Sequence, residues 1–220
     1  MIDSFYELRT KSLPHPRGLL SAVVNGDSLY FAGGTTSEAE LNSISKAVDV
    51  YTFGMGWIDS FKLNQERFQF AAVTLGNKIY FGGGLTDTSA LSSVEVYNTI
   101  THSLSSNTSP FYAKPLQLPS GPGWGLGAAA AGKYVAFAGI GSSSDQVDYF
   151  DTTTLTWKTT KLSVGREPLA FNSIIGIAGV SVGNKIIFVG GIENGDYSDA
   201  MDIFDGDDFS HRNETMPHPL

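Results

Sequence analysis

The sequence predicts an all-β fold built from a repeated unit of four short strands. Three features that recur four times carry this prediction: a phenylalanine-containing strand that ends at glycine, a small-residue turn before it, and an alternating strand after it. The recurring phenylalanines are Phe31, Phe81, Phe137 and Phe188, which are 50, 56 and 51 residues apart. A period of this length indicates an array of equivalent units.

The first two strands of each unit form a predicted hairpin, seen most clearly in the second unit. Ala71-Ala72-Val73 is small and apolar, as suits a crowded inner position, and Gly76-Asn77-Lys78 provides the tight turn. The second strand, Ile79-Tyr80-Phe81, runs into Gly82-Gly83-Gly84, where glycine permits a sharp exit or a close approach of the backbone.

The third strand of each unit alternates with period two and carries an acid at its second position. In the second unit it reads Val94-Glu95-Val96-Tyr97, so one face packs and the other holds the acid. The fourth strand opens on a large apolar residue, namely Trp57, Leu104, Trp157 and Phe209 in the four units. No segment shows sustained helical periodicity, and the density of Gly, Ser and Thr disfavours helices.

Four such sheets stacked around an axis bury faces that one sheet alone leaves exposed, so the predicted architecture is a β-propeller. The four visible blades are expected at residues 18–63, 68–118, 125–163 and 177–213 of one domain spanning 1–220.

The order Arg, apolar strand, glycine turn, aromatic, Gly-Gly, Val-x-Val-Tyr and Trp resembles the kelch repeat over nearly the whole chain. The units from Trp57 to Gly84 and from Trp157 to Gly191 fit closely, apart from an eight-residue excess after Arg166. The third unit departs from the pattern, because Ile140 replaces the second glycine and Gly123 stands where the other units have arginine. The resemblance implies a propeller that usually has five to seven blades.

The ends of the chain suggest that these four blades are part of a longer propeller. Residues 1–12 look like the outer strand of a preceding or closing blade, which leaves one outer strand more than a closed four-bladed ring needs.

The composition of the chain argues against several classes of function. A formal net charge of −8 argues against nucleic acid and against anionic membrane surfaces, both of which require clustered Lys and Arg. The absence of cysteine excludes disulfides, thiolate metal sites and a cysteine nucleophile. The N-terminus lacks the features of a signal peptide, which favours a cytoplasmic location.

The longer predicted connections, those between second and third strands and between successive blades, fall at one face of the propeller. Recognition residues normally lie on such loops, so binding is expected there. Arg17, Arg67 and Arg166 recur beside this face, either as a ring that receives an acidic partner or as structural ties to backbone carbonyls or acids. Trp124 and Tyr197 lie in the same connections and are candidate binding residues.

The sequence contains few motifs that are typical of catalytic or metal-binding sites. The acids of residues 193–208 do not have the spacing of a calcium loop, the four histidines are not spaced as metal ligands, and no nucleophile elbow occurs. We therefore expect no catalytic residues, metal or cofactor.

The sequence thus predicts a noncatalytic scaffold that presents loops to a protein partner, as the kelch resemblance also implies. The alternative is a propeller enzyme of epimerase or lyase type, or a carbohydrate-binding module, with its site in an axial pocket. The kelch-like copper oxidases are discounted, because the resemblance implies a Tyr-Cys crosslink that a chain without cysteine cannot form.

Overall fold

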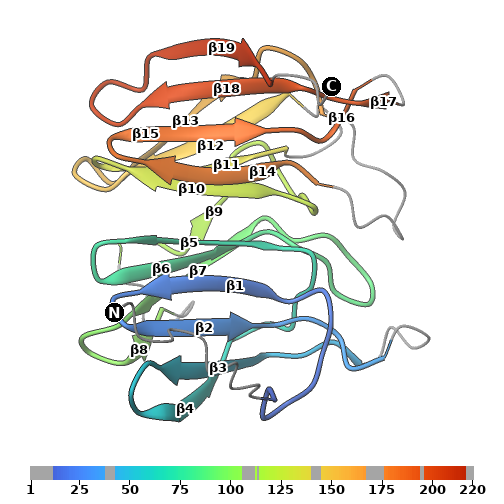
Figure 1. The fold of residues 1–220 in the computed structure, drawn as a ribbon, viewed down its shortest axis with the longest axis vertical. Coiled ribbons are helices and arrows are strands. Elements are labelled where there is room, and N and C mark those ends of the chain that lie inside the picture. The colour runs from blue at the N-terminus through green and yellow to red at the C-terminus, as the bar shows by residue number, and fades with distance from the viewer. Residues whose placement is uncertain are drawn as a thin grey trace, which may run out of the picture.

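A computed structural model describes residues 12–37, 43–105, 112, 114–139, 145–166, 176–193 and 196–216. The four repeated units form four antiparallel sheets, so the prediction of an all-β fold with four four-stranded blades is confirmed (Figure 1). Residues 1–11, most of the predicted extra outer strand, lie outside the described residues. No helix that forms within the described ranges is long and apolar enough to cross a membrane.

Each blade is a meander in which neighbouring strands follow one another along the chain. Blade 1 consists of β1 (Ser21–Asn25), β2 (Ser28–Ala32), β3 (Ala47–Thr52) and β4 (Gly56–Lys62). Blade 2 consists of β5 (Ala71–Leu75), β6 (Lys78–Gly82), β7 (Ser93–Asn98) and β8 (Ser103–Leu104), with β9 (Leu116–Gln117) also paired to β7.

Blades 3 and 4 repeat this order. Blade 3 consists of β10 (Gly127–Ala131), β11 (Tyr134–Ala138), β12 (Gln146–Asp151) and β13 (Thr156–Lys161). Blade 4 consists of β14 (Ala178–Val182), β15 (Lys185–Val189), β18 (Ala200–Asp205) and β19 (His211–Thr215). The hairpin of β16 (Ile192–Glu193) and β17 (Asp196–Tyr197) lies between β15 and β18 in sequence.

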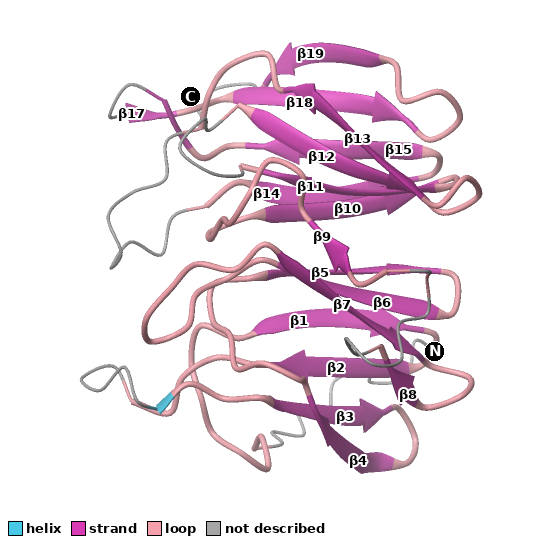
Figure 2. Cartoon of the chain, turned by 180° about the vertical axis from the view of Figure 1, so that it is seen from behind, coloured by secondary structure: helices cyan, strands magenta, loops and turns pink. Residues whose placement is uncertain are grey.

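The fourth strand of blade 2 differs from the expected continuous strand that opens on Leu104. It is split in two, because β8 pairs with the last residues of β7 and β9 pairs with the first residues of β7. Residues 105–115 separate the two pieces along the chain, and part of this segment lies outside the described residues. Both views place β9 at the junction of blades 2 and 3 (Figure 2).

The first strand of each blade is its inner strand, and the four inner strands pack side by side in sequence order. β1 packs against β5, β5 against β10, and β10 against β14. Hydrogen bonds also join them: the hydroxyl of Thr74 donates to the Val24 carbonyl at 2.8 Å, and the Ala130 N–H donates to the Ser181 hydroxyl at 3.0 Å. β1 and β14 therefore stand at the two ends of an arc, and the described residues show no comparable packing between them.

Each blade has two ends, which differ in the connections that lie there. The loop end is the end at which the inner strands begin, and the turn end is the end at which they turn into the second strands. The hydrophobic core lies between neighbouring blades, where the sheets meet face to face.

Candidate functional site

The three recurring arginines are buried inside their own blades. Their side chains are 0%, 0% and 2% exposed for Arg17, Arg67 and Arg166. Each guanidinium donates to the carbonyl of the first glycine after the second strand, at 2.6–2.8 Å; these acceptors are Gly33, Gly83 and Gly190. The arginines thus hold the exit of the second strand in place, which is the structural alternative expected for a repeated position.

Each buried arginine also pairs with the acid of the third strand. The nitrogen–oxygen distances are 2.6 Å for Arg17 and Asp49, 2.7 Å for Arg67 and Glu95, and 2.9 Å for Arg166 and Asp202. Burial lowers the pKa of Arg67, while the charge and hydrogen bond of Glu95 act in the opposite direction. These guanidinium groups are therefore bonded within the blade and do not face solution, although the Nε of Arg67 is buried without a hydrogen-bond partner among the described residues.

Blade 3 holds the same acid without an arginine, because Gly123 occupies the corresponding position. Asp148 is fully buried and accepts hydrogen bonds from the N–H and hydroxyl of Ser120, at 2.9 and 2.6 Å. Burial raises the pKa of Asp148, although the hydrogen bonds from Ser120 and Thr159 lower it in part. A buried carboxylate with only neutral donors is more costly in its charged form than one paired with a guanidinium.

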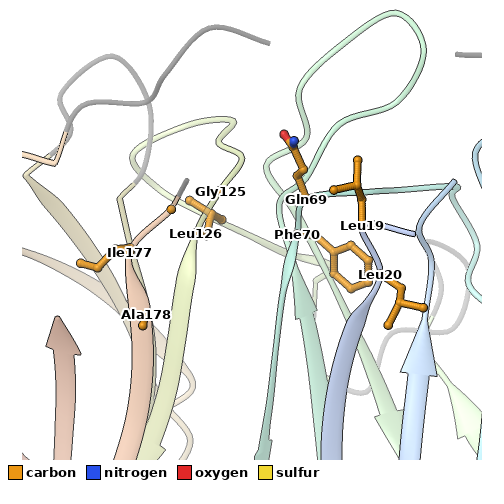
Figure 3. A pocket seen from close by; sticks show the side chains of 9 residues that line it. Leu19, Leu20, Gln69, Phe70, Gly125, Leu126, Ile177 and Ala178 are labelled. Carbon is orange, nitrogen blue, oxygen red and sulfur yellow. The ribbon is translucent and has the colours of Figure 1, made fainter. Parts of the chain in front are cut away.

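A cavity of about 320 Å³ opens at the loop end, where the four inner strands begin (Figure 3). Equivalent residues from all four blades line it: Leu19, Leu20, Gln69, Phe70, Gly125, Leu126, Gly176, Ile177 and Ala178. The described side chains that line it are apolar apart from the Gln69 amide, and none is titratable, but polar atoms make up slightly more of the exposed cavity surface than apolar atoms do. Such a lining suits the contact of an apolar side chain with a small polar group beside it.

The rim of this cavity carries unusual backbone geometry. Leu19 and Gln69 have φ angles of 53° and 51°, and the equivalent Gly125 has 65°. A side chain in the left-handed region costs free energy and persists only where the surroundings enforce it, often at functional sites. Here the enforcing contacts are backbone hydrogen bonds between blades: Gly125 N–H donates to Gln69 C=O at 2.9 Å, and Gln69 N–H to Leu19 C=O at 3.3 Å.

The two aromatic candidates take different positions. Trp124 is partly buried and directly precedes Gly125 at the cavity rim, whereas Tyr197 is 81% exposed at the end of β17. None of the five residues proposed from sequence lines the cavity itself.

The cavity residues were missed because Leu, Phe, Gly and Ala carry no chemical signal of their own. A positional signal exists, since Leu19, Gln69 and Gly125 each lie two residues after Arg17, Arg67 and Gly123.

The described side chains also contain no group of three or more His, Asp or Glu that could hold a metal ion.

Comparison with known proteins supports the interpretation of the second unit as a kelch repeat. The family model of the kelch motif matches residues 66–103, which run from the residue before Arg67 through β5, β6 and β7 to the start of β8. No curated protein matches the chain in sequence.

Proposed function

We propose that this chain, in which residues 66–103 match the kelch motif, is a noncatalytic scaffold that binds a protein partner at its loop end. Kelch repeats commonly mediate protein–protein interactions. The observation that carries the proposal is the cavity to which all four blades contribute equivalent residues. A partner side chain seated there would touch every blade at once, so the arc would act as one receptor.

The residues proposed from sequence take two roles in this scheme. Trp124, at the cavity rim, and Tyr197, exposed on its hairpin, are the proposed aromatic anchors, because aromatic side chains supply much contact area at little entropic cost. Arg17, Arg67 and Arg166 are proposed positioning residues. Each is buried inside its blade and fixes the backbone at the point where a loop leaves the second strand.

The alternative ligand is a carbohydrate, which also stacks on exposed aromatic rings. The described cavity lining offers one amide and no acid or base, so it supports recognition in preference to proton transfer. Carbohydrate therefore remains a competing outcome of the binding test.

The test places a photo-crosslinking amino acid at Tyr197 and, in a second variant, at Ile100. Ile100 is 71% exposed in the turn between β7 and β8, so it is a matched control at the turn end. We expect partner adducts from position 197 that disappear when Gln69→Arg fills the cavity mouth, and none from position 100. Adducts from position 100 alone, or saturable binding to a glycan array with no protein adduct, would overturn the proposal.

A further inference from the structure

A second cavity continues the loop-end cavity along the inner strands of the blades. It has a volume of about 490 Å³ and is lined by residues 22–24 of β1, 72–74 of β5, 128–129 of β10 and 179–181 of β14, together with Leu29. In each blade this lining begins one or two positions after the last residue that lines the loop-end cavity. The two cavities therefore follow one another along the same four strands, and we name the second one the inner-strand cavity.

The loop-end cavity offers mainly main-chain groups to a ligand. Its polar surface belongs to the Gln69 amide and to the backbone N–H and C=O groups of the lining residues, since no other lining side chain is polar. When an extended peptide binds, main-chain hydrogen bonds give affinity, and pockets for alternate side chains give specificity. The combination of backbone donors and acceptors with apolar side chains therefore favours an extended polypeptide segment as the ligand.

The inner-strand cavity suits an apolar side chain of such a segment, because its exposed surface is mainly apolar. The two hydroxyls in its lining already take part in bonds between blades: Thr74 donates to the Val24 carbonyl at 2.8 Å, and Ser181 accepts from a backbone N–H of β10 at 3.0 Å. The centres of the two linings lie three to four residues apart, for example from residues 69–70 to 72–74 in blade 2, which is about 10–13 Å along a strand. An extended segment of about four residues reaches from one cavity into the other.

The connections at the loop end carry an excess of acidic side chains. Their described residues include six acids: Glu66, Asp87, Asp145, Glu193, Asp196 and Asp199. The arginines of these connections are buried inside the blades, and Lys46 is the one exposed lysine among the same described residues. Lys62 and Lys161 also lie at this end, but on outer strands, away from the inner strands that line the cavity. The turn end is more balanced, because three lysines lie at its hairpin turns, namely Lys78, Lys133 and Lys185.

Three of the loop-end acids form no ion pair with a described residue: Asp87, Glu193 and Asp196. Asp87 is exposed and lies two residues after Leu85, whose backbone pairs with the residue that precedes Gln69 of the cavity lining. Asp196 is exposed on the hairpin that carries Tyr197. Blades 2 and 4 therefore both present negative charge to a segment bound at the loop end.

We propose that the partner presents an extended, basic segment to these cavities, an inference that rests on the proposed binding of a protein partner at the loop end. The backbone of the segment hydrogen-bonds in the loop-end cavity, and one of its apolar side chains enters the inner-strand cavity. Lys or Arg side chains beside it lie against Asp87 and Asp196. Opposite charges of this kind speed association and select the partner.

The experiment measures binding of the 220-residue chain to an array of short synthetic peptides whose net charge and apolar content vary independently. We expect the bound peptides to combine an apolar residue with neighbouring Lys or Arg. N-methylation of the backbone amides removes main-chain donors and should weaken binding of the best peptide about tenfold. Wild-type affinity should fall as the salt concentration rises, because the charges that contribute to it are exposed.

Two double variants make the same change in net charge at opposite ends of the blades. Asp87→Lys with Asp196→Lys reverses the loop-end charges and should weaken binding of basic peptides about tenfold. Asp27→Lys with Asp207→Lys is the matched control at the turn end, where both acids are exposed, and should change the affinity by less than about twofold.

Four results would contradict the inference: a preference for acidic peptides, equal losses in the two double variants, an affinity independent of salt, or a best peptide that N-methylation leaves unchanged. Should no peptide bind, the partner segment in the adduct formed at position 197 is identified by mass spectrometry. A basic segment there supports the inference, and any other segment overturns it. The proposed function fails separately, when position 197 forms no protein adduct at all.

Discussion

A buried guanidinium that holds a glycine carbonyl and an acid together is the recurring residue-scale device of this molecule. In blade 2, Arg67 donates to Gly83 and Ser93 carbonyls and to the Glu95 carboxylate with its side chain fully removed from solvent. Removing the cation would leave Glu95 buried without its charge partner, and that residual charge dominates the cost.

Arg67→Ala should therefore destabilise the chain by about 3–5 kcal/mol, as other broken buried pairs do. Urea unfolding followed by tryptophan fluorescence measures this loss. Lys46→Ala is the matched control, because Lys46 and Glu66 form a pair 3.7 Å apart with both side chains about 40% exposed, and its loss should stay below about 1 kcal/mol. Equal losses for the two variants would show that the blade does not depend on the buried pair.

Two acids on β12 should respond to pH with opposite signs. Burial raises the pKa of Asp148 above its unfolded value, so its charge opposes folding at neutral pH and this cost disappears in acid. For Asp151, burial also acts upward, but hydrogen bonds from Thr153 and Thr154 and the charge of Lys133 outweigh it and lower the pKa from 3.8 to about 2. Its stabilisation is present above the unfolded pKa and is lost as pH falls from about 4 toward 2.

At pH 7 we expect Asp148→Asn to raise the free energy of unfolding and Asp151→Asn to lower it. Both differences should shrink as the pH is lowered to 3, and urea titrations at several pH values measure them. A destabilised Asp148→Asn at pH 7 would mean that Ser120 and Thr159 satisfy the charged carboxylate better than its burial penalises it.

At the scale of elements, the hairpin turn between the first two strands of a blade is the most local feature. Its glycines have left-handed φ angles, 58° at Gly26 and 56° at Gly132, which explains why the turn was predictable from sequence. The surroundings of the two glycines differ, because a Cβ at Gly26 meets no atom within 4 Å, whereas one at Gly132 would overlap the carbonyl oxygen of Gly206 in blade 4.

Gly26→Ala should cost about 1 kcal/mol, the strain of a side chain in the left-handed region. Gly132→Ala should cost clearly more, because it adds a backbone clash between blades 3 and 4. Thermal unfolding of both variants measures the difference. Similar melting temperatures would show that the two blades separate freely at this turn.

The split of the fourth strand of blade 2 could not be predicted from the sequence. The apolar-acid-apolar pattern locates β7, since strand periodicity is local. Nothing local indicates that Leu116 and Gln117 would return to pair with Ser93 and Val94 after the insertion. That pairing is a long-range contact, which depends on the packing of the finished blade.

At the scale of the whole molecule, neighbouring blades share one core. Phe137 of blade 3 is fully buried and packs over Gly82 of blade 2, where a Cβ would overlap its ring. Phe137→Ala should therefore cost about 3–5 kcal/mol and also lower amide protection in β6 of the neighbouring blade.

Hydrogen exchange read strand by strand measures both effects of Phe137→Ala. Leu155→Ala is the control, because Leu155 is 50% exposed at a turn of the same blade and its removal should change neither. Loss of protection confined to β10–β13 would contradict a shared core.

The array of blades was predictable and the cavity was not, for one physical reason. Repeat spacing, turn glycines and alternation are properties of neighbouring residues, so four blades follow from them. The cavity depends on how Leu19, Gln69, Gly125 and Gly176 meet from four different blades, and their side chains give no chemical signal in isolation. The arginines were recognised in the sequence as a recurring position beside the loop end. The acids that pair with them lie about 30 residues further along the chain, and only the register of the strands brings each acid to its arginine.

The connection that enters each blade also caps the acid inside it. Asn64, after β4 of blade 1, donates to Glu95 in blade 2; Ser120, at the end of blade 2, donates to Asp148 in blade 3; and Ser163 does the same for Asp202 in blade 4. A modular unit of this protein is therefore offset from its visible sheets, because the capping donor lies seven residues before the inner strand in blades 2 and 3 and fifteen residues before it in blade 4. Shuffling or truncating blades at the sheet boundaries would separate each buried carboxylate from the residue that donates a hydrogen bond to it. A cut placed just before the capping turn would keep each acid and its donor in the same piece.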